Sequence, residues 1–505
     1  MRSRAIDGRP TGSKPFRIST IKLANLADTA PDFAADGRAR ELIALLASGG
    51  DARITLDPAS GFNRYMSTPY PCAVLAYASS TANDMSPAAF GHLLEQQADG
   101  SGREGYAERL DGLRDRLRRA YGLEGDTAIV FAPSGTDLEY VALAAARGKA
   151  PEGIHNVLLG ADEVGSGCIH SAHGRYFAQE TALGRTAVPG EPVPGLGPVS
   201  LADIPVRCEQ GLPQDSTAIS DAIAQEIELA RAGRRHALVH VVHGSKTGLI
   251  LPEMAELEGL RAQYGDNADF VVDACQARID AETVNAYLAR GMIVFLSGSK
   301  FMGGPPFSGF ALVPRAIAAA ATALPAGFEQ VFRRAEWPAD WAGRDILVDE
   351  GNPGLTLRLE GSIFELERFA ALPKARVARA IDGFVKAVRS ELVEPLGLDI
   401  VATHGEAGAA RQNPIEMRTL VTLDLSAIQG LETYEDARKL HRSMALAGVR
   451  LGQPVQCVRR GGVWGPTMRV CLSMPQFSDL DAKGASLEDQ LALDMQRIAR
   501  ELAAA

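Results

Sequence analysis

The stretch MIVFLSGSKFMGGPPFSGFALV, residues 292–313, contains two apolar runs separated by a turn rich in serine and glycine. The runs at 292–296 and 309–313 have the length and composition of buried strands. Lys300 lies in the turn between them, a few residues after the first run. A lysine held in a low-dielectric cleft loses its charge readily and can form a Schiff base. The stretch therefore predicts a reactive lysine beside a sheet, with an exposed loop lysine as the alternative.

Further apolar runs of this kind precede the stretch and alternate with amphipathic segments. The additional strands are predicted at 127–132, 156–159, 237–242 and 270–273. The helices are predicted at 138–147, 218–231, 252–264 and 281–288. This alternation is typical of an α/β protein with a mostly parallel sheet, in which ligands bind at the carboxyl ends of the strands.

The segment FAPSGTDLEYVAL, residues 131–143, joins a predicted strand directly to a helix through Ser134, Gly135 and Thr136. Free N–H groups at the helix start, two hydroxyls and a glycine that permits close approach suit a phosphate group. A capping box formed by Thr136 and Glu139, with no ligand, explains the same residues. Taken alone, the segment does not decide between the two interpretations.

Asp273 ends the hydrophobic strand of FVVDACQAR, residues 270–278. A carboxylate there is costly to bury without a partner, which could be a metal, an arginine or a protonated ring nitrogen. No second carboxylate lies nearby at metal-ligand spacing, so no metal is predicted. A helix cap or an ion pair is the plain alternative.

Together these three segments predict one site with a phosphate cradle, a carboxylate and a Schiff-base lysine. Those are the parts by which proteins hold pyridoxal phosphate. Ser297 and Ser299, which precede Lys300, could also hold the phosphate. Lys246 in HVVHGSKTGLILP follows another strand and competes with Lys300 for the covalent link.

The motifs resemble those of the fold-type-I pyridoxal-phosphate enzymes, within them the class V aminotransferase and cysteine desulfurase group. The matching patterns are SGT at 134–136, DACQ at 273–276 and SGSK at 297–300. The resemblance implies that Asp273 pairs with the ring nitrogen of the cofactor, that Gln276 reaches the ring hydroxyl, and that Lys300 carries the Schiff base. It covers residues 125–315 well and the C-terminal part more loosely. It also implies a homodimer, in which Ser362 of the partner subunit is a candidate to complete the phosphate site.

Two positions differ from the pattern of the group. Ser299 stands where the group has a histidine before the lysine, and Val164 stands where the group stacks a histidine on the ring. His170 or His173 could take that stacking role, and satisfied structural histidines are the alternative.

The resemblance extends to the segment GPTMRVCLSM, residues 465–474, where Arg469 matches the arginine that binds the α-carboxylate of the substrate. A guanidinium group recognises a free carboxylate through two parallel hydrogen bonds. An arginine in a surface ion pair is the alternative, and Arg358 is a second candidate for carboxylate binding.

The resemblance implies an enzyme that transforms an amino acid, with an aminotransferase favoured and Lys300 as the base for the Cα proton. Cysteine desulfuration or C–S lysis is the alternative, because Cys457 lies 12 residues (469 − 457) before Arg469. Arg459 and Arg460 could lower the pKa of that thiol, whereas a buried inert thiol is the plainer interpretation. A non-catalytic binding protein that keeps the fold is a third hypothesis.

The composition limits the classes of partner. The chain has 505 residues, 46% of them hydrophobic, and its net charge of −10 argues against a nucleic-acid or membrane-surface protein. No apolar run approaches the roughly 18 to 20 residues of a membrane span. The six cysteines are scattered and no apolar leader opens the chain, so reduced thiols and a cytoplasmic location are expected.

The chain is expected to divide into an N-terminal segment (1–60), a large cofactor-binding domain (61–373) and a smaller α+β domain (374–505) that begins with a connecting helix. The Pro- and Gly-rich segment 181–200 has no periodicity and is predicted as a long loop. Either a lid or a disordered surface insertion would fit that segment.

Overall fold

The fold is centred on one sheet in the middle of the molecule. The computed structural model describes residues 36–99, 105–161, 163–164, 168–404, 414–480 and 486–504. The strand order is β2 (Ala128–Ala132), β9 (Gly309–Val313), β8 (Ile293–Ser297), β7 (Ala268–Asp273), β5 (His236–His243), β3 (Ile154–Leu159) and β4 (Val199–Ile204). Neighbouring strands on this path run parallel except around β9, which is antiparallel to both of its neighbours. The short β6 (Ile250–Leu251) pairs antiparallel with the end of β5.

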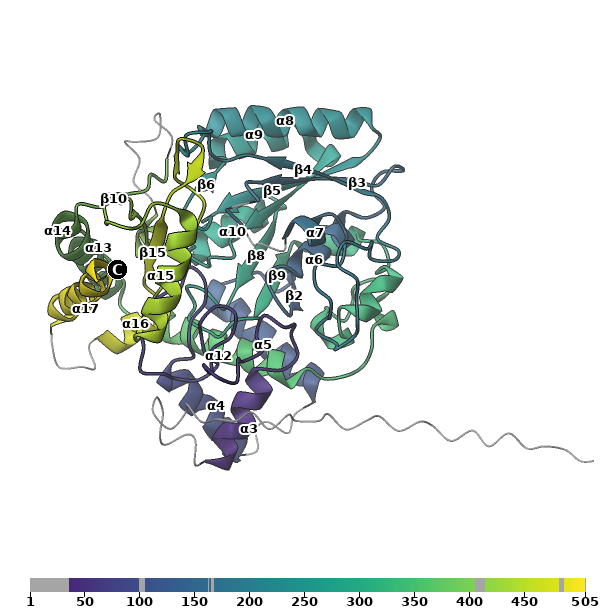
Figure 1. The fold of residues 1–505 in the computed structure, drawn as a ribbon. Helices are drawn as coiled ribbons and strands as arrows, with labels where there is room; N and C mark the ends of the chain where they lie inside the picture. The colour runs from purple at the N-terminus through teal and green to yellow at the C-terminus, as the bar shows by residue number, and fades with distance from the viewer. Residues whose placement is uncertain are drawn as a thin grey trace, which may run out of the picture.

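Helices cover both faces of this sheet (Figure 1). Because successive side chains of a strand point to opposite faces, Val271 belongs to the core under α6 (Leu138–Ala146), whereas Val272 belongs to the core of the other face. The helices of that other face include α5 (Tyr106–Tyr121), α8 (Ser216–Ala232), α9 (Met254–Tyr264) and α10 (Ala281–Ala289). The sheet is therefore buried on both sides, as its apolar strands require.

The C-terminal part forms a smaller α+β unit beside the main sheet (Figure 1). The helical segment that leads into it consists of α13 (Lys374–Val388), a π-helical turn (Arg389–Val393) and α14 (Glu394–Leu396). Its antiparallel sheet has the order β10 (Asp399–Ile400), β11 (Leu420–Asp424), β15 (Thr467–Cys471). The helices that pack around it are α15 (Tyr434–Leu446), α16 (Met474–Asp479) and α17 (Leu487–Ala503).

Residues 36–99, called the N-terminal segment from here on, pack on the C-terminal unit and on α12 (Pro353–Ala370). Strand β1 (Leu75–Tyr77) pairs in parallel with β12 (Val449–Leu451). Helices α3 (Gly37–Leu46) and α4 (Pro87–Asp99) pack against α12 and share a small apolar core with it. Segments that are far apart in the sequence are therefore joined around the main sheet.

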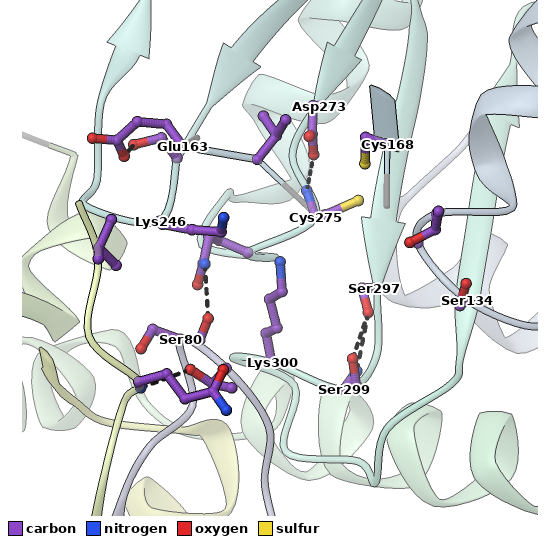
Figure 2. A pocket seen from close by; sticks show the side chains of 18 of the residues that line it. Ser80, Ser134, Glu163, Cys168, Lys246, Asp273, Cys275, Ser297, Ser299 and Lys300 are labelled. Atoms are coloured by element: carbon purple, nitrogen blue, oxygen red, sulfur yellow. Dashed lines mark hydrogen bonds between the residues drawn. The ribbon is translucent and has the colours of Figure 1, made fainter. Parts of the chain in front are cut away.

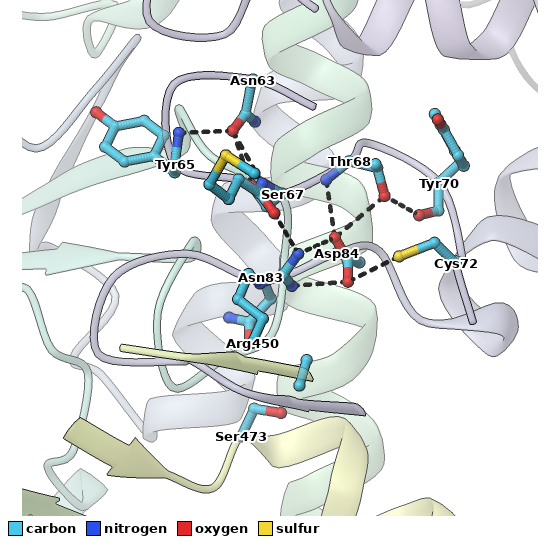
Figure 3. A network of polar contacts seen from close by, with 12 residues as sticks. Asn63, Tyr65, Ser67, Thr68, Tyr70, Cys72, Asn83, Asp84, Arg450 and Ser473 are labelled. Atoms are coloured by element: carbon cyan, nitrogen blue, oxygen red, sulfur yellow. Dashed lines mark hydrogen bonds and ion pairs between the residues drawn. The ribbon is translucent and has the colours of Figure 1, made fainter. Parts of the chain in front are cut away.

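A buried ion pair fixes the N-terminal segment in place (Figure 3). The carboxylate of Asp84 accepts hydrogen bonds from Arg450 Nη1 at 2.8 Å and Nη2 at 2.7 Å, and from the backbone N–H of Thr68 at 2.8 Å. The adjacent Asn83 donates through Nδ2 to the carbonyl oxygens of Ser299 at 3.1 Å and Lys300 at 2.6 Å. The network thereby connects the C-terminal unit, the N-terminal segment and the loop of Lys300.

The predicted fold class is confirmed, since every strand predicted for the main sheet is present with ends shifted by at most a few residues. Strand β4, with the sequence VSLADI, was not predicted. The segment 181–200 is a loop up to β4, and it is held by backbone hydrogen bonds such as Tyr176 N–H to Glu191 O at 2.9 Å. Among the described residues, no helix has the length and apolar character needed to cross a membrane.

Candidate active site

A cavity of about 420 Å³ lies at the carboxyl ends of the central strands. All the residues predicted from the sequence to bind cofactor or substrate line it: Ser134, Gly135, Thr136, Asp273, Gln276, Ser297, Ser299, Lys300 and Arg469. Lys246, the competing lysine, lines it as well. The structure therefore brings together groups from four strands of the main sheet and from β15.

Lys300 points from its loop into the cavity, with its amine directed toward the end of β7 (Figure 2). Beside it, the hydroxyl groups of Ser297 and Ser299 are hydrogen bonded at 2.7 Å. The backbone of the loop lies so close to α12 that a Cβ atom at Gly298 or Gly304 would collide with Ser362. Ser362 is itself fully buried within its own chain, so the expectation that it completes a partner's phosphate site is wrong.

Asp273 lies at the end of β7, and one of its carboxylate oxygens accepts the backbone N–H of Cys275 at 2.9 Å. Glu139 and His240 lie close enough to interact electrostatically with it, and they approach each other at 3.3 Å between Oε2 and Nε2. Burial raises the pKa of Glu139 well above its usual value and lowers the pKa of His240 to about 4. Burial thus disfavours the charged form of both groups in the wall beside Asp273.

The predicted capping box between Thr136 and Glu139 is not formed. The N-cap of α6 is Asp137, and Glu139 faces His240 under the sheet edge instead of folding back to the helix start. Asp137 accepts a hydrogen bond from Ser134 Oγ at 2.6 Å, and burial raises its pKa to about 7. The hydroxyl of Thr136 accepts a hydrogen bond from Arg53 Nη1 at 3.2 Å.

Lys246 lies on the wall opposite the phosphate turn, next to a buried acidic network (Figure 2). Its backbone N–H donates to Glu163 O at 2.8 Å. Burial and the positive charge of Arg469 lower the pKa of the Lys246 amine to about 8, although Glu163 opposes the shift. Burial alone would raise the pKa of Glu163, but the guanidinium of Arg207, at 2.7 Å, holds it below its usual range.

Arg469 is 3% exposed and donates only to neutral oxygen atoms. Its partners are the carbonyls of Gln453 at 2.9 Å, Lys246 at 3.2 Å and Ser80 at 3.3 Å, and the hydroxyl of Thr81 at 2.9 Å. Within the described ranges no carboxylate forms an ion pair with it. A buried cation held in this way against the cavity attracts an anionic ligand.

Several other predicted candidates lie away from the cavity. Cys457 is 1% exposed and lies in an apolar cluster with Val401 and Val455. Burial raises the pKa of its thiol to about 12. The expectation that Arg459 and Arg460 lower this pKa is therefore wrong. Arg358 is fully buried and donates to backbone carbonyls of other segments, which makes it a structural residue.

Neither predicted stacking histidine is among the described residues that line the cavity. His170 is exposed on the short helix α7 (Cys168–Ala172), and His173 follows that helix. Val164 and Cys168 form this part of the wall. If a planar ring lies here, an apolar side chain and a thiol flank it where the related group has an imidazole.

The cavity also contains residues that belong to no local motif. The polar and aromatic composition of segments 61–71 and 76–86 indicates either the entry of a substrate pocket or a surface crossing, and Tyr65, Ser80 and Thr81 of these segments line the cavity. Sequence reasoning missed Arg53, Tyr434 and Gln453, because only their approach across long stretches of sequence places them at the site.

Comparison with known proteins supports the fold. No family model matches the chain, and no curated protein matches it in sequence. Among solved structures, a complex of the cystine C–S lyase C-DES with its product cysteine persulfide has a TM-score of 0.51 and 14% identity, over 85% of this chain and 97% of that one. The cysteine desulfurase CsdA from Escherichia coli has a TM-score of 0.50 and 16% identity, over 85% and 95%. A NifS-like protein has a TM-score of 0.50 and 11% identity, over 85% and 99%.

These likenesses cover most of the chain, including the sheet whose strand ends form the cavity. The resemblance stated from the motifs at 134–136, 273–276 and 297–300 is confirmed at the level of the fold. The chain has the fold of the fold-type-I pyridoxal-phosphate-dependent enzymes.

Proposed function

We propose that the protein is a pyridoxal-phosphate-dependent aminotransferase. The observation that carries this proposal is the convergence of Lys300, Asp273 and the hydroxyls of the 134–136 turn on one cavity that also contains Arg469. The first three are the groups that hold the cofactor in enzymes of this kind, and a buried arginine without a carboxylate partner suits the α-carboxylate of an amino acid.

The residues of the cavity fit the cofactor in size and chemistry. A volume of about 420 Å³ lies in the range of small-molecule sites. The Ser80 hydroxyl, which lines the cavity, is buried without a hydrogen-bond partner among the described residues. Lys300 would hold the aldehyde, Asp273 the ring nitrogen and Gln276 the ring hydroxyl. The phosphate would lie at Ser134, Gly135 and Thr136, beside Ser297 and Ser299.

Bound pyridoxal phosphate supplies a protonated ring that accepts electrons from the bond broken at Cα of the substrate. The Asp273 carboxylate at the end of β7 would favour the proton on the ring nitrogen, because an opposite charge nearby stabilises the protonated form. Lys300 Nζ then takes the Cα proton and returns it, as the amine that points into the cavity. Arg469 holds the α-carboxylate and so fixes which Cα bond faces the ring.

Desulfuration through Cys457 receives no support from the site. The thiol is buried in its own apolar cluster and its pKa is raised, so little thiolate forms near pH 7. Transamination needs no nucleophile beyond Lys300, and the groups that it needs are present. The resemblance adds a homodimer to the proposal, and sedimentation of the active protein measures its oligomeric state. The scattered cysteines add a cytoplasmic location.

The visible absorption spectrum of the purified protein with added pyridoxal phosphate tests the proposal. A band that persists in Lys246→Ala and is lost in Lys300→Ala is expected. Amino-acid substrates should then shift the band and give the oxo acid, and Cys457→Ala should behave like the wild type. Loss of sulfur release in Cys457→Ala would identify a desulfurase instead, and a band that no amino acid perturbs would identify a binding protein. Absence of any band would overturn the proposal.

A further inference from the structure

Arg53 reaches the phosphate turn from the N-terminal segment, far from the turn in sequence. We propose that Arg53 binds the phosphate group of pyridoxal phosphate, an inference that rests on the function proposed above. The resemblance placed the phosphate at the 134–136 turn and assigned no residue before position 125. The structure adds a cation to that turn from within the same chain.

The guanidinium group of Arg53 contacts both hydroxyls of the turn. Nη1 donates to Thr136 Oγ1 at 3.2 Å, and Nη2 donates to Ser134 Oγ at 3.3 Å. These bonds are at the long end of the usual range, and hydroxyls are the weakest acceptors for a charged donor. A phosphate bound at the turn would present ionised oxygen atoms to the same N–H groups, on the same edge of the guanidinium.

Asp51 orients the guanidinium without occupying that edge. Its carboxylate accepts from Nε at 2.9 Å and from Nη2 at 2.7 Å. An arginine has five N–H groups, so this pair leaves three of them, two on Nη1 and one on Nη2. Two of the three make the long bonds to Thr136 and Ser134, and the Tyr65 hydroxyl also interacts with the guanidinium. The fork that remains has the geometry for bidentate binding of a phosphate.

Two aromatic rings hold the guanidinium plane in position. Its central carbon lies 4.7 Å from the ring centre of Phe307 and 5.1 Å from that of Phe177. The Arg53 side chain is only 16% exposed. A cation that is stacked and paired in this way is already ordered, so ligand binding costs little further side-chain entropy.

The position of Arg53 separates it from the cations at the substrate end. Arg469 donates to the carbonyl oxygen of Lys246 at 3.2 Å. Arg53 donates instead to Ser134 and Thr136 of the turn. Of the described cavity residues, Arg53 is therefore the cation associated with the turn, whereas Lys246 and Arg469 belong to the other end.

A comparison of two ligands of the apoprotein tests the proposal: pyridoxal phosphate and pyridoxal, which lacks the phosphate. Dissociation constants are measured by absorbance and tryptophan fluorescence. Arg53→Ala should weaken binding of pyridoxal phosphate roughly 10- to 100-fold while pyridoxal binds as in the wild type. Arg53→Lys, which keeps the charge and loses the fork, should fall between them. Arg64→Ala is the matched control, because Arg64 lies exposed in the same segment.

Removal of Arg53 alone leaves Asp51 buried without its partner, so the double variant Asp51→Asn/Arg53→Gln is measured beside it, with thermal unfolding as the check on folding. Selective loss of pyridoxal phosphate affinity in the folded double variant supports the proposal. Equal weakening of both ligands, or unchanged affinity for pyridoxal phosphate, overturns it. If the wild type binds pyridoxal phosphate no better than Lys300→Ala does, the proposed function itself is wrong. This outcome is distinct from a failure of the Arg53 proposal, in which the wild type binds pyridoxal phosphate more tightly than Lys300→Ala but the Arg53 variants show no selective loss.

Discussion

At the scale of single residues, the cavity is defined by how its cations are held. Arg53 is paired with Asp51, whereas Arg469 contacts only neutral oxygens and lies near Lys246. Such an arrangement maintains a positive potential at the Lys246 end of the cavity. The positive potential favours a carboxylate there, and it makes the protonated form of Lys246 costly in the folded protein.

The replacement Lys246→Met tests that cost in the apoprotein. The folded pKa of Lys246 is about 8 and the usual value is 10.5, so the unfolded chain binds the proton more tightly. The free energy of unfolding of the wild type relative to Lys246→Met should therefore rise as pH rises from about 8 to 10.5, by up to ~3 kcal/mol. Urea unfolding at several pH values measures this difference. Lys439→Met, at an exposed position, should show no such trend, and a pH-independent difference for Lys246→Met would contradict the assignment.

The sequence was sufficient to find Lys300, Asp273 and the 134–136 turn, because each directly follows a recognisable strand. It could not find Arg53 or the partners of Arg469, because those contacts join residues about 80 to several hundred positions apart. It also misjudged Glu139, whose spacing from Thr136 fits a capping box. The N-cap residue is Asp137, which makes no side-chain cap bond, and Glu139 faces His240 instead.

At the scale of elements, the loop of Lys300 is shaped by its contact with α12. The glycines of the loop let its backbone pass over Ser362, and Asn83 holds the carbonyl of Lys300 from the other side. The position of Lys300 thus depends on two elements besides its own strand.

Strand β4 could not be predicted from the sequence, because its mixed polar sequence at the edge of the sheet resembles that of a loop.

Gly304→Ala should destabilise the protein, because the added Cβ would collide with the Ser362 hydroxyl on α12. We expect a loss of about 1–3 kcal/mol in the free energy of unfolding, the usual effect of overpacking. Gly304→Ala/Ser362→Ala should recover part of the loss, because the nearest atom is removed. In Gly112→Ala, at an exposed helical site with open space, the free energy of unfolding should stay the same or rise. Equal loss in the single and double variants would show that Ser362 is not the cause.

At the scale of the whole molecule, three parts of the chain meet at the Asp84–Arg450 pair. Arg450 belongs to β12 of the C-terminal unit, Asp84 to the N-terminal segment, and the neighbouring Asn83 reaches the main sheet through the Lys300 loop. Arg450 is 1% exposed, so its charge is compensated almost entirely by Asp84. The pair connects the N-terminal segment to the C-terminal unit and lies apart from the candidate active site.

Arg450→Met should cost about 3–5 kcal/mol of stability, because it leaves the Asp84 carboxylate buried and unpaired. The double variant Asp84→Asn/Arg450→Met should be markedly milder, since both charges are removed together. Denaturant unfolding measures the stability of both variants. Arg438→Met, which removes an exposed ion pair on the same unit, should change the stability by less than about 1 kcal/mol. Single and double variants of equal stability would argue against a buried ion pair.

The parallel pairing of β1 with β12 has a consequence for biosynthesis. The partner strand of residues 75–77, at 449–451, is synthesised 374 residues later (449 − 75). Until then Asp84 has no Arg450, and Asn83 lacks the support that sets it against the Lys300 loop. A nascent chain can therefore form the central sheet well before it can complete the cavity, so ligand binding is expected only after the C-terminal unit has been made.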